Sequence, residues 1–294
     1  MDTSILIVSH NRKEELSFTL SKLEQYIDYS KHEILVFLDG CNDNSLELQT
    51  IFPRVVWSSS NKILGASGAR NVLYKKAKGD ILIGLDDDAH PLHDDFITRT
   101  IRLFEMYPDV GIIAYQELKG VVNFNDCEII DFNKVIEEYF TNEFIGCGFA
   151  VKKNVYEQTR GFPVWVDIYG EESCVAIEVL SKGYNILYTN RITVNHRVNI
   201  LQRKLNEQNY YRFGKQLKNR AYFYVVYYKY PFRDILKLLR HNFIKYGLMD
   251  FKYFKIFFRT IFEILLGIPR VLKYRNPIDN KRISEINKLP KLKF

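Results

Sequence analysis

The stretch GDILIGLDDDAHP, residues 79–91, constrains the fold of this chain more than any other. Residues 81–85 are almost wholly apolar, and three carboxylates follow them at once, Asp86, Asp87 and Asp88. A short apolar run of this kind predicts a strand that is buried on both faces, as in a parallel sheet. Because adjacent carboxylates repel one another, a divalent cation such as Mg²⁺ or Mn²⁺, which prefers oxygen ligands, would stabilise them. Ligands of open α/β sheets bind beyond the carboxyl ends of strands, so the sequence predicts a metal site here, with a solvated acidic turn as the alternative.

Two earlier apolar runs place another carboxylate at the same edge of the predicted sheet. Residues 3–8 (TSILIV) and 33–38 (EILVFL) are typical of buried strands. The segment between them has leucines at helical spacing, with Asn11 as its expected N-cap. Strand, helix and strand in this order form a βαβ unit. Asp39 directly follows the second strand, so we expect it at the same edge as the three aspartates.

A glycine-rich turn follows within residues 61–78 (NKILGASGARNVLYKKAK). Gly65 and Gly68 stand just ahead of a helical stretch that carries Arg70. The N-terminus of a helix can bind an anion through its free N–H groups, and an arginine adds a charged fork for phosphate. A phosphate-binding turn is therefore one interpretation, and an ordinary turn is the other.

Further along the chain, helices and strands continue to alternate. Residues 94–107 have apolar residues at helical spacing, and residues 110–115 are typical of a strand. Residues 117–143 are less regular and richer in charge. Gly146 and Gly148 come next, and glycines permit the close approach of a substrate to the backbone.

Two glutamates and a histidine complete the set of polar candidates. Glu171 and Glu172 begin a predicted helix, where carboxylates complement the helix dipole even without a further role. His196 comes after a strand predicted at residues 185–189, and a lone histidine is more often structural than functional. Arg197, the next residue, offers a charge for a diphosphate.

Three of these blocks, FLDGCNDNS, NKILGASGARN and GDILIGLDDDAHP, resemble in order and spacing the nucleotide-binding half of the family 2 glycosyltransferases. The resemblance covers roughly residues 3–196. It implies a GT-A fold, which is a Rossmann-like α/β architecture with a mostly parallel sheet flanked by helices. It also implies an inverting enzyme that moves a sugar from a nucleotide-sugar donor, UDP- or dTDP-linked, to an acceptor hydroxyl.

On the donor side, the resemblance implies a role for five side chains. Asp39 contacts the nucleobase and Arg70 the nucleotide. Asp86 and Asp88 form the DxD element, in which Asp88 holds the Mg²⁺ or Mn²⁺ that bridges the diphosphate of the donor. His196 matches a histidine near that metal and diphosphate.

On the acceptor side, the resemblance implies that the segment around Gly148 is where the acceptor sugar rests. Glu172 falls on the position of the general base, which in the family is more often an aspartate. Glu171 is its positioning neighbour. In this mechanism the base removes a proton from the acceptor hydroxyl, which attacks the anomeric carbon in a single displacement.

The charge of the chain divides it into two regions. Residues 1–196 hold 19 Lys and Arg against 29 Asp and Glu, a net charge of −10, whereas residues 197–294 hold 23 against 6, a net charge of +17. We therefore expect a catalytic domain at residues 1–196, with nucleotide-sugar binding in about 1–115 and the acceptor and catalytic part in about 116–196. Residues 197–294 are predicted to be a basic region that meets anionic surfaces.

The basic region has the composition of interfacial helices. Residues 210–232 are crowded with tyrosines, and residues 235–249 and 251–268 place large apolar residues at helical spacing with Lys and Arg between them. Helices of this type lie in a membrane interface rather than crossing it. The prediction is a peripheral protein at the cytoplasmic face of the cell membrane, acting on a lipid-linked saccharide in the synthesis of a surface polysaccharide. The alternative is that the apolar faces pack on the catalytic domain or on a second copy of the chain, as a homodimer. Nucleic acid is not expected as a partner.

Other features narrow the classes of protein. Four cysteines at positions 41, 127, 147 and 174 form no zinc-type spacing and indicate thiols in a reducing compartment. The first residues lack the pattern of a signal peptide, and no apolar run has the length of a membrane span. A phosphatase of the DxD type would carry its motif on the first strand, about 80 residues earlier. The remaining alternative is a membrane-attached binding protein without catalytic activity.

Overall fold

The computed structural model describes residues 1–120, 135–198 and 208–293. Its strands are β1 Thr3–Ser9, β2 His32–Asp39, β3 Val56–Ser60, β4 Ile81–Asp86, β5 Ala89–Pro91, β6 Val110–Lys119, β7 Glu138–Thr141, β8 Gly148–Lys152 and β9 Asn185–His196. Its helices are α1 Lys13–Leu23, η1 Ser45–Glu47, α2 Leu48–Ile51, α3 Gly65–Tyr74, α4 Phe96–Met106, α6 Lys153–Tyr156, α7 Glu171–Ser181, α9 Gln208–Tyr227, α10 Phe232–Asn242, η2 Phe243–Gly247, α11 Phe251–Leu272 and α12 Asn280–Lys288.

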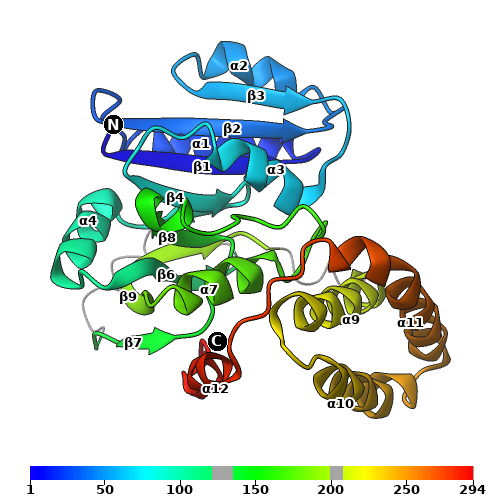
Figure 1. The fold of residues 1–294 in the computed structure, drawn as a ribbon. Coiled ribbons are helices and arrows are strands. Elements are labelled where there is room, and N and C mark those ends of the chain that lie inside the picture. Colours follow the sequence, from blue (N-terminus) through cyan, green and yellow to red (C-terminus); the bar gives the residue numbers. More distant parts are fainter. Residues whose placement is uncertain (121–134, 199–207, 294) are drawn as a thin grey trace.

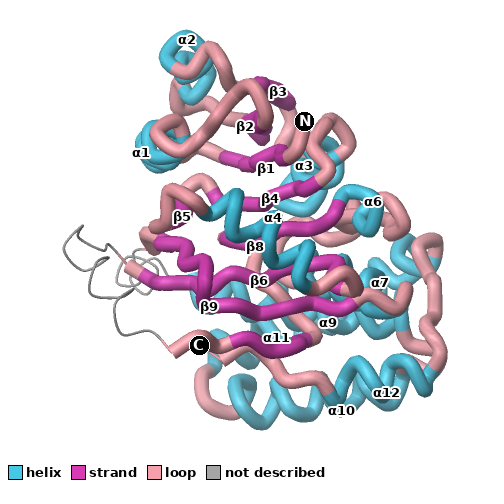
Figure 2. The backbone as a smooth tube through the Cα atoms, turned by 90° about the vertical axis from the view of Figure 1, so that its left-hand side faces the viewer, coloured by secondary structure: helices cyan, strands magenta, loops and turns pink. Residues whose placement is uncertain are grey.

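The strands form one mixed sheet in the order β3-β2-β1-β4-β8-β6-β9-β5, with β7 paired to β9 (Figure 1). The first four are parallel, as the βαβ pattern predicted, and β6 is parallel to β9. β8 lies antiparallel between β4 and β6, and the same succession of strands is visible from the side in Figure 2. The predicted α/β fold class is confirmed.

Alternating residues of the buried strands point to opposite faces of the sheet. Ile5, Ile34 and Ile83 face a core that α1 and α4 cover. Leu6 and Leu82 face the other core, which α3, α7, α9 and α12 cover. Because both faces are covered by helices, the strands are apolar at almost every position rather than at every second one. This is why they were visible in the sequence as short apolar runs.

Residues 208–293 share a core with the part of the chain that precedes them. α9 buries Tyr222 and Val226 in the same cluster as Val179 of α7. α11 packs along α9, and the hydroxyl of Tyr222 donates to the carbonyl of Glu263 at 3.0 Å. The packing alternative considered above thus describes α9 and α12, whereas much of α10 and α11 remains at the surface. In the described part of the chain, no helix has the length and apolar character needed to span a bilayer.

Some local expectations differ from the structure. Asn11 is not the N-cap of α1, because the helix begins at Lys13 with Arg12 before it. Asn11 instead has a positive φ of 52°, and its side-chain oxygen accepts the N–H of Asn42. Most of the irregular segment 117–143, and Cys127 with it, lies outside the described residues. Cys41, Cys147 and Cys174 are free thiols.

Candidate active site

The acidic motif lies at the carboxyl end of β4, as predicted. β4 ends at Asp86, and after two residues the chain continues as the short strand β5, which is antiparallel to β9. This pairing sets Ala89 opposite His196 and so brings Asp88 beside the imidazole. Nε2 of His196 lies 3.2 Å from Oδ1 of Asp88.

Three side chains here offer oxygen and nitrogen ligands of the kind that a divalent cation binds. Ligand atoms of Asp86, Asp88 and His196 lie within 4.8 Å of one another. Oδ1 of Asp88 is buried, and apart from Nε2 of His196 it has no polar partner among the described residues. Nδ1 of His196 lies 2.5 Å from Oε1 of Glu117, a contact that fixes the ring with Nε2 toward the aspartates. Two carboxylates and an imidazole suit Mn²⁺ or Mg²⁺, so the residues present fit the predicted metal.

Arg12 was not among the predicted site residues, yet it contacts two of the three aspartates. Its Nη1 donates to Oδ1 of Asp87 at 2.8 Å, and its Nη2 donates to Oδ2 of Asp88 at 2.6 Å. The guanidinium therefore supplies part of the positive charge that the acidic run requires. The sequence hints at this role of Arg12 only by its position, three residues after the end of β1 at the same edge of the sheet.

The surroundings shift the pKa values of Asp87 and Asp88 in opposite directions. Burial raises the pKa of Asp87 to about 7, because the charge of Arg12 offsets only part of the lost solvation. Asp88 is also buried, but His196 and Arg12 outweigh the burial and hold its pKa well below the usual range. Of Asp87 and Asp88, Asp88 is therefore the one that stays ionised over the whole physiological range.

A second cluster of charges surrounds Arg70 of α3. Nη2 of this buried arginine lies 2.6 Å from Oδ1 of Asp86, and its Nη1 lies 3.3 Å from Glu171 and 3.5 Å from Glu172. One guanidinium thus joins the end of β4 to the start of α7, and links Asp86 of the acidic motif to the predicted base. In this structure the predicted nucleotide-binding side chain is engaged by carboxylates of the site itself.

The two glutamates differ in exposure. The side chain of Glu171 is 4% exposed, and its Oε2 has no hydrogen-bond partner within the described ranges, whereas the side chain of Glu172 is 23% exposed. Burial, reinforced by the charge of Glu172, raises the pKa of Glu171 to about 8. Burial also raises the pKa of Glu172, against the opposing charge of Arg70. Glu172 is thus the carboxylate that a substrate can reach.

Asp39 ends β2 at the predicted edge of the sheet, and its carboxylate binds the turn ahead of α3. It accepts the backbone N–H of Leu64 at 2.7 Å and of Gly65 at 2.9 Å. The anion at this helix N-terminus is therefore a carboxylate of the chain. Gly65 has a φ of +79°, and a Cβ there would lie 2.7 Å from the carbonyl oxygen of Asp167, so glycine is required at this position.

Gly146 and Gly148, which were both expected to permit close approach to the backbone, have different surroundings. A Cβ at Gly148 would lie 2.7 Å from the side chain of Val194, so Gly148 leaves room for this β9 side chain at the start of β8. A Cβ at Gly146 would lie 2.5 Å from Oε1 of Glu172 and 2.8 Å from Nη2 of Arg70. Gly146 therefore borders the charged cluster, and Gly148 does not.

The loop before α7 is held by α9, a contact that the sequence analysis did not anticipate. Tyr169 and Gly170 both have positive φ values, 67° and 100°, directly ahead of Glu171. The side-chain amide of Asn219 donates to the carbonyl of Ile168 at 2.8 Å and to that of Tyr169 at 2.9 Å. An asparagine within a long helix carries no distinct sequence signal for such a role.

Arg197 is engaged by side chains of the protein itself. Its guanidinium binds Glu15 and Thr19 of α1 and Nδ1 of His90, at 2.9, 2.8 and 2.7 Å respectively. It also stacks over Phe18, with 4.5 Å between the guanidinium carbon and the ring centroid. Arg197 therefore holds the end of β9 against α1.

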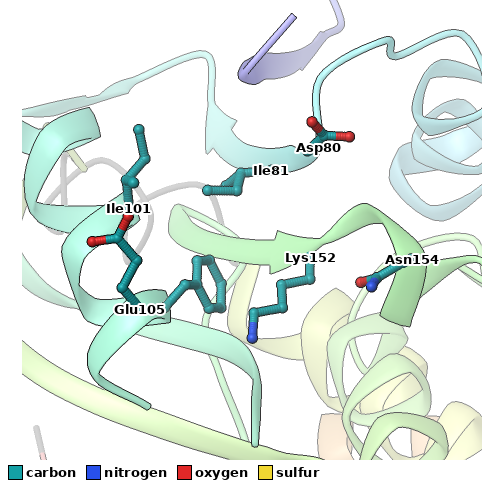
Figure 3. Close-up of a pocket in the computed structure, with 7 residues that line it drawn as sticks. Asp80, Ile81, Ile101, Glu105, Lys152 and Asn154 are labelled. Atoms are coloured by element: carbon teal, nitrogen blue, oxygen red, sulfur yellow. The ribbon is translucent and has the colours of Figure 1, made fainter. Parts of the chain in front are cut away.

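Two of the cavities in the described structure differ in their relation to this site. One of about 390 Å³ lies at the start of β4 and the end of β8, lined by Asp80 and Lys152 among others (Figure 3). That is the opposite end of β4 from the aspartates. The other, of about 230 Å³, is lined by Leu64, Val164, Trp165, Val166, Asp167, Lys218 and Arg270. It lies between the turn before α3 and the helices α9 and α11.

A comparison with known families decides the identity of this arrangement. The model of the glycosyl transferase family 2 matches residues 4–153, which include β1 to β8 and the acidic motif. The chain belongs to glycosyltransferase family 2. The DxD phosphatase alternative is thereby set aside, and the motif follows β4 rather than the first strand.

Relatives of this family 2 glycosyltransferase agree in sequence and in fold. The Escherichia coli protein WfaP, a UDP-Glc:α-D-GlcNAc-diphosphoundecaprenol β-1,3-glucosyltransferase, is 26% identical over 206 residues, 66% of this chain and 76% of WfaP. The mannosyltransferase PcManGT of Pyrobaculum calidifontis, solved with GDP-Man and Mn²⁺, has a TM-score of 0.59 at 16% identity and covers 97% of this chain and 83% of its own. Residues 1–349 of S. aureus TarS, solved with UDP-GlcNAc, have a TM-score of 0.61 at 13% identity and cover 94% and 84%. These structures confirm the GT-A fold.

Proposed function

We propose that this glycosyltransferase moves a sugar from a nucleotide-sugar donor to a hydroxyl of a lipid-linked saccharide, with inversion at the anomeric carbon. The observation that carries the proposal is the joining of donor-side and acceptor-side carboxylates by Arg70. Asp86 of the DxD element and Glu172 at the start of α7 contact the same guanidinium. Such an arrangement fits a reaction in which the leaving diphosphate and the general base lie on either side of one sugar.

The donor side is formed by residues at the carboxyl ends of β2 and β4. Asp39 orders the turn before α3 and, having further lone pairs, accepts from a nucleobase as well. Asp86, Asp88 and His196 would hold the divalent cation. When bound, such a cation neutralises the charge that develops on the departing nucleoside diphosphate. UDP- and dTDP-sugars are the donors that we expect.

The acceptor side is formed by the start of α7. Glu172 accepts the proton of the acceptor hydroxyl, and the raised pKa makes this carboxylate a stronger base than a free glutamate. Glu171 is buried behind it and shares Arg70, so that it positions rather than reacts. Attack by the hydroxyl opposite the leaving group gives inversion, and no covalent intermediate with the enzyme is needed.

A lipid-linked acceptor suits the chemistry around the 230 Å³ cavity. Its lining combines two cations, Lys218 and Arg270, with apolar side chains such as Trp165. A diphosphate that joins a sugar to a lipid offers the matching anionic and apolar parts. The similarity to WfaP, whose acceptor is a diphosphoundecaprenol-linked sugar, supports this choice. We therefore propose that the enzyme acts in bacterial surface-polysaccharide synthesis.

The test is a transfer assay with the full chain. It is incubated with UDP-Glc, UDP-GlcNAc or dTDP-rhamnose and a short-chain lipid diphosphate carrying GlcNAc, with Mn²⁺ or with a chelator. Mass spectrometry is expected to show one added sugar that depends on the metal, and NMR of the product is expected to show the inverted anomer. A retained anomer would contradict the mechanism. Binding of donors without turnover on any acceptor would favour the non-catalytic binding protein.

A further inference from the structure

The outward face of α11 is a continuous apolar stripe at the protein surface. Its side chains are between 36% and 70% exposed, and we call them the outer stripe: Phe251, Phe254, Phe258, Phe262, Leu265, Leu266 and Leu272. Successive members are mostly three or four positions apart, so they lie on one side of a helix with 3.6 residues per turn. The stripe runs the whole length of the helix.

The outer stripe is not the side of α11 that packs within the chain. The opposite side of α11 buries Phe257, Thr260, Ile264 and Val271. Thr260 faces Gly214 of α9. α11 is thus apolar on two sides, of which one already has a partner within the chain. Large apolar side chains gathered on one exposed face indicate an interaction surface rather than the scattered exposure of ordinary proteins.

The stripe continues onto the neighbouring helices. The ring of Phe243 in η2 contacts those of Phe254 and Phe258 at an angle, with ring centroids 6.2 Å apart in both pairs. Leu248 and Met249, in the turn between η2 and α11, are 64% and 80% exposed. In Figure 1, α10 and α11 form the outer rim of the helical lobe, away from the sheet.

Positive charge accompanies the stripe. Lys255 and Lys273 lie within its angular range on the helix, and Arg259 and Arg270 lie along one edge of it, all of them exposed. Residues 232–273 hold nine Lys and Arg against three Asp and Glu. Of these three acids, Asp250 caps α11 by accepting the N–H of Lys252, and Glu263 pairs with Arg259 at 3.0 Å. The surface therefore presents apolar side chains together with uncompensated cations.

We infer that the outer stripe binds the surface of an anionic phospholipid bilayer, with α11 lying in the plane of the interface. Aromatic and leucine side chains enter the boundary between headgroups and acyl chains, while lysines and arginines meet the anionic headgroups. The inference stands on this surface alone. It adds to the proposed function the membrane that carries the acceptor.

Two other occupants match the surface less well. A second copy of the chain, related by two-fold symmetry, would set the stripe against itself and bring like-charged edges together, at an electrostatic cost. A nucleic acid would match the cations, but Leu265, Leu266 and Leu272 offer it no planar face for base stacking. Each of these occupants is an outcome of the experiment below.

The experiment is flotation of the full chain with liposomes. Vesicles of phosphatidylcholine alone are compared with vesicles that also contain phosphatidylglycerol, at low and high salt. The wild-type chain is expected to float with the anionic vesicles at low salt and to remain behind in the other conditions. Lys255→Gln with Lys273→Gln is expected to weaken binding by at least tenfold, since each cation near an anionic surface contributes about fivefold.

A matched pair of double variants tests the apolar part. Phe258→Ser with Phe262→Ser removes exposed apolar side chains from the stripe, and Leu46→Ser with Ile51→Ser removes side chains of 54% and 59% exposure from the far end of the sheet. All of these side chains are exposed, so unchanged circular dichroism and thermal unfolding are expected for both. The stripe variant is expected to lose flotation and the control to keep it.

Several results would overturn the inference. The first is a wild-type chain that does not float with anionic vesicles at low salt, and the second is an equal loss of flotation in both double variants. The third is a wild-type dimer in analytical ultracentrifugation that is absent in the stripe variant. Displacement of the vesicles by a short RNA, with retained binding of the stripe variant to that RNA, would point to nucleic acid instead. A chain that floats but transfers no sugar would retain this inference and contradict the proposed function. A chain that transfers sugar but does not float would contradict this inference and leave the proposed function intact.

Discussion

Asn219 of α9 donates a side-chain hydrogen bond of 2.9 Å to the backbone carbonyl of Tyr169, two residues before Glu171. A second bond of 2.8 Å from the same amide reaches Ile168. Tyr169 has a left-handed backbone conformation, which is uncommon for a residue with a bulky side chain and persists only where its surroundings hold it. A helix from the basic C-terminal region thus holds the loop that directly precedes Glu171 and Glu172.

The first prediction tests that support. Asn219→Ala leaves two carbonyls without their donor, each at a cost of about 1–3 kcal/mol, so the loop is expected to relax. We expect kcat to fall about tenfold while donor binding, measured by calorimetry, stays near wild type. Asn142→Ala is the matched control, because Asn142 also donates two amide bonds, to Ile286 and Leu289, at a distance from the site. Equal losses of kcat in the two variants would mean that only general stability is affected.

The second prediction concerns the metal. Asp88→Ala removes a buried, ionised carboxylate whose Oδ1 lies beside Nε2 of His196. Transfer is expected to be abolished, and calorimetry is expected to show weaker binding of UDP in the presence of Mn²⁺ but not in the presence of a chelator. Asp95→Ala removes an exposed carboxylate that pairs only with Arg99 within the described structure and serves as the charge control. Unchanged metal-dependent binding in Asp88→Ala would remove Asp88 from the ligand set.

The third prediction separates the base from its neighbour. Glu172→Gln keeps the shape of the side chain but cannot accept a proton, so kcat is expected to fall by about 10²–10⁴-fold, the usual contribution of a general base. Donor affinity is expected to change little. Glu171→Gln keeps a hydrogen-bonding group near Arg70 and is expected to lower kcat less. If Glu171→Gln is the more damaging of the two, the roles assigned to these residues are reversed.

The fourth prediction follows from the pKa of Glu172, which burial raises above its ordinary value of 4.5. The carboxylate is the active form of a base, so kcat/KM is expected to fall as the pH drops through the raised pKa and to level off above it. The measurement is a pH–rate profile of the wild-type chain, with the stability of the fold followed over the same range. A flat profile down to the ordinary pKa of a glutamate would contradict the assignment.

The parts of the fold that the sequence predicted are those set by local composition. Strands covered on both faces must be apolar along their length, which made β1, β2 and β4 recognisable and placed Asp39 and Asp86 at one edge. Helical spacing likewise indicated α4, within one or two residues of its observed ends. Each of these features depends only on neighbours in the chain.

The features that escaped prediction depend on contacts between distant segments. Arg12 reaches Asp88, and Asn219 reaches Tyr169, through pairings that no local pattern encodes. The different surroundings of the two glycines likewise come from distant segments, since Gly146 lies against Arg70 and Glu172 whereas Gly148 lies against Val194. Asn11 was predicted as an N-cap from its residue type alone, whereas its side-chain oxygen accepts the N–H of Asn42 instead. In each case the tertiary arrangement overrides the local preference.

The core that α7 shares with α9 and α12 determines how this enzyme unfolds. Because Tyr222 and Val179 belong to one apolar cluster, the acidic and basic regions are expected to unfold together, as a single cooperative transition rather than two. A nucleotide that binds only the folded state then raises the melting temperature of helices that it never touches. For evolution this means that donor and acceptor preferences are not carried on exchangeable modules. A new acceptor must be accommodated within the same folding unit that holds the donor.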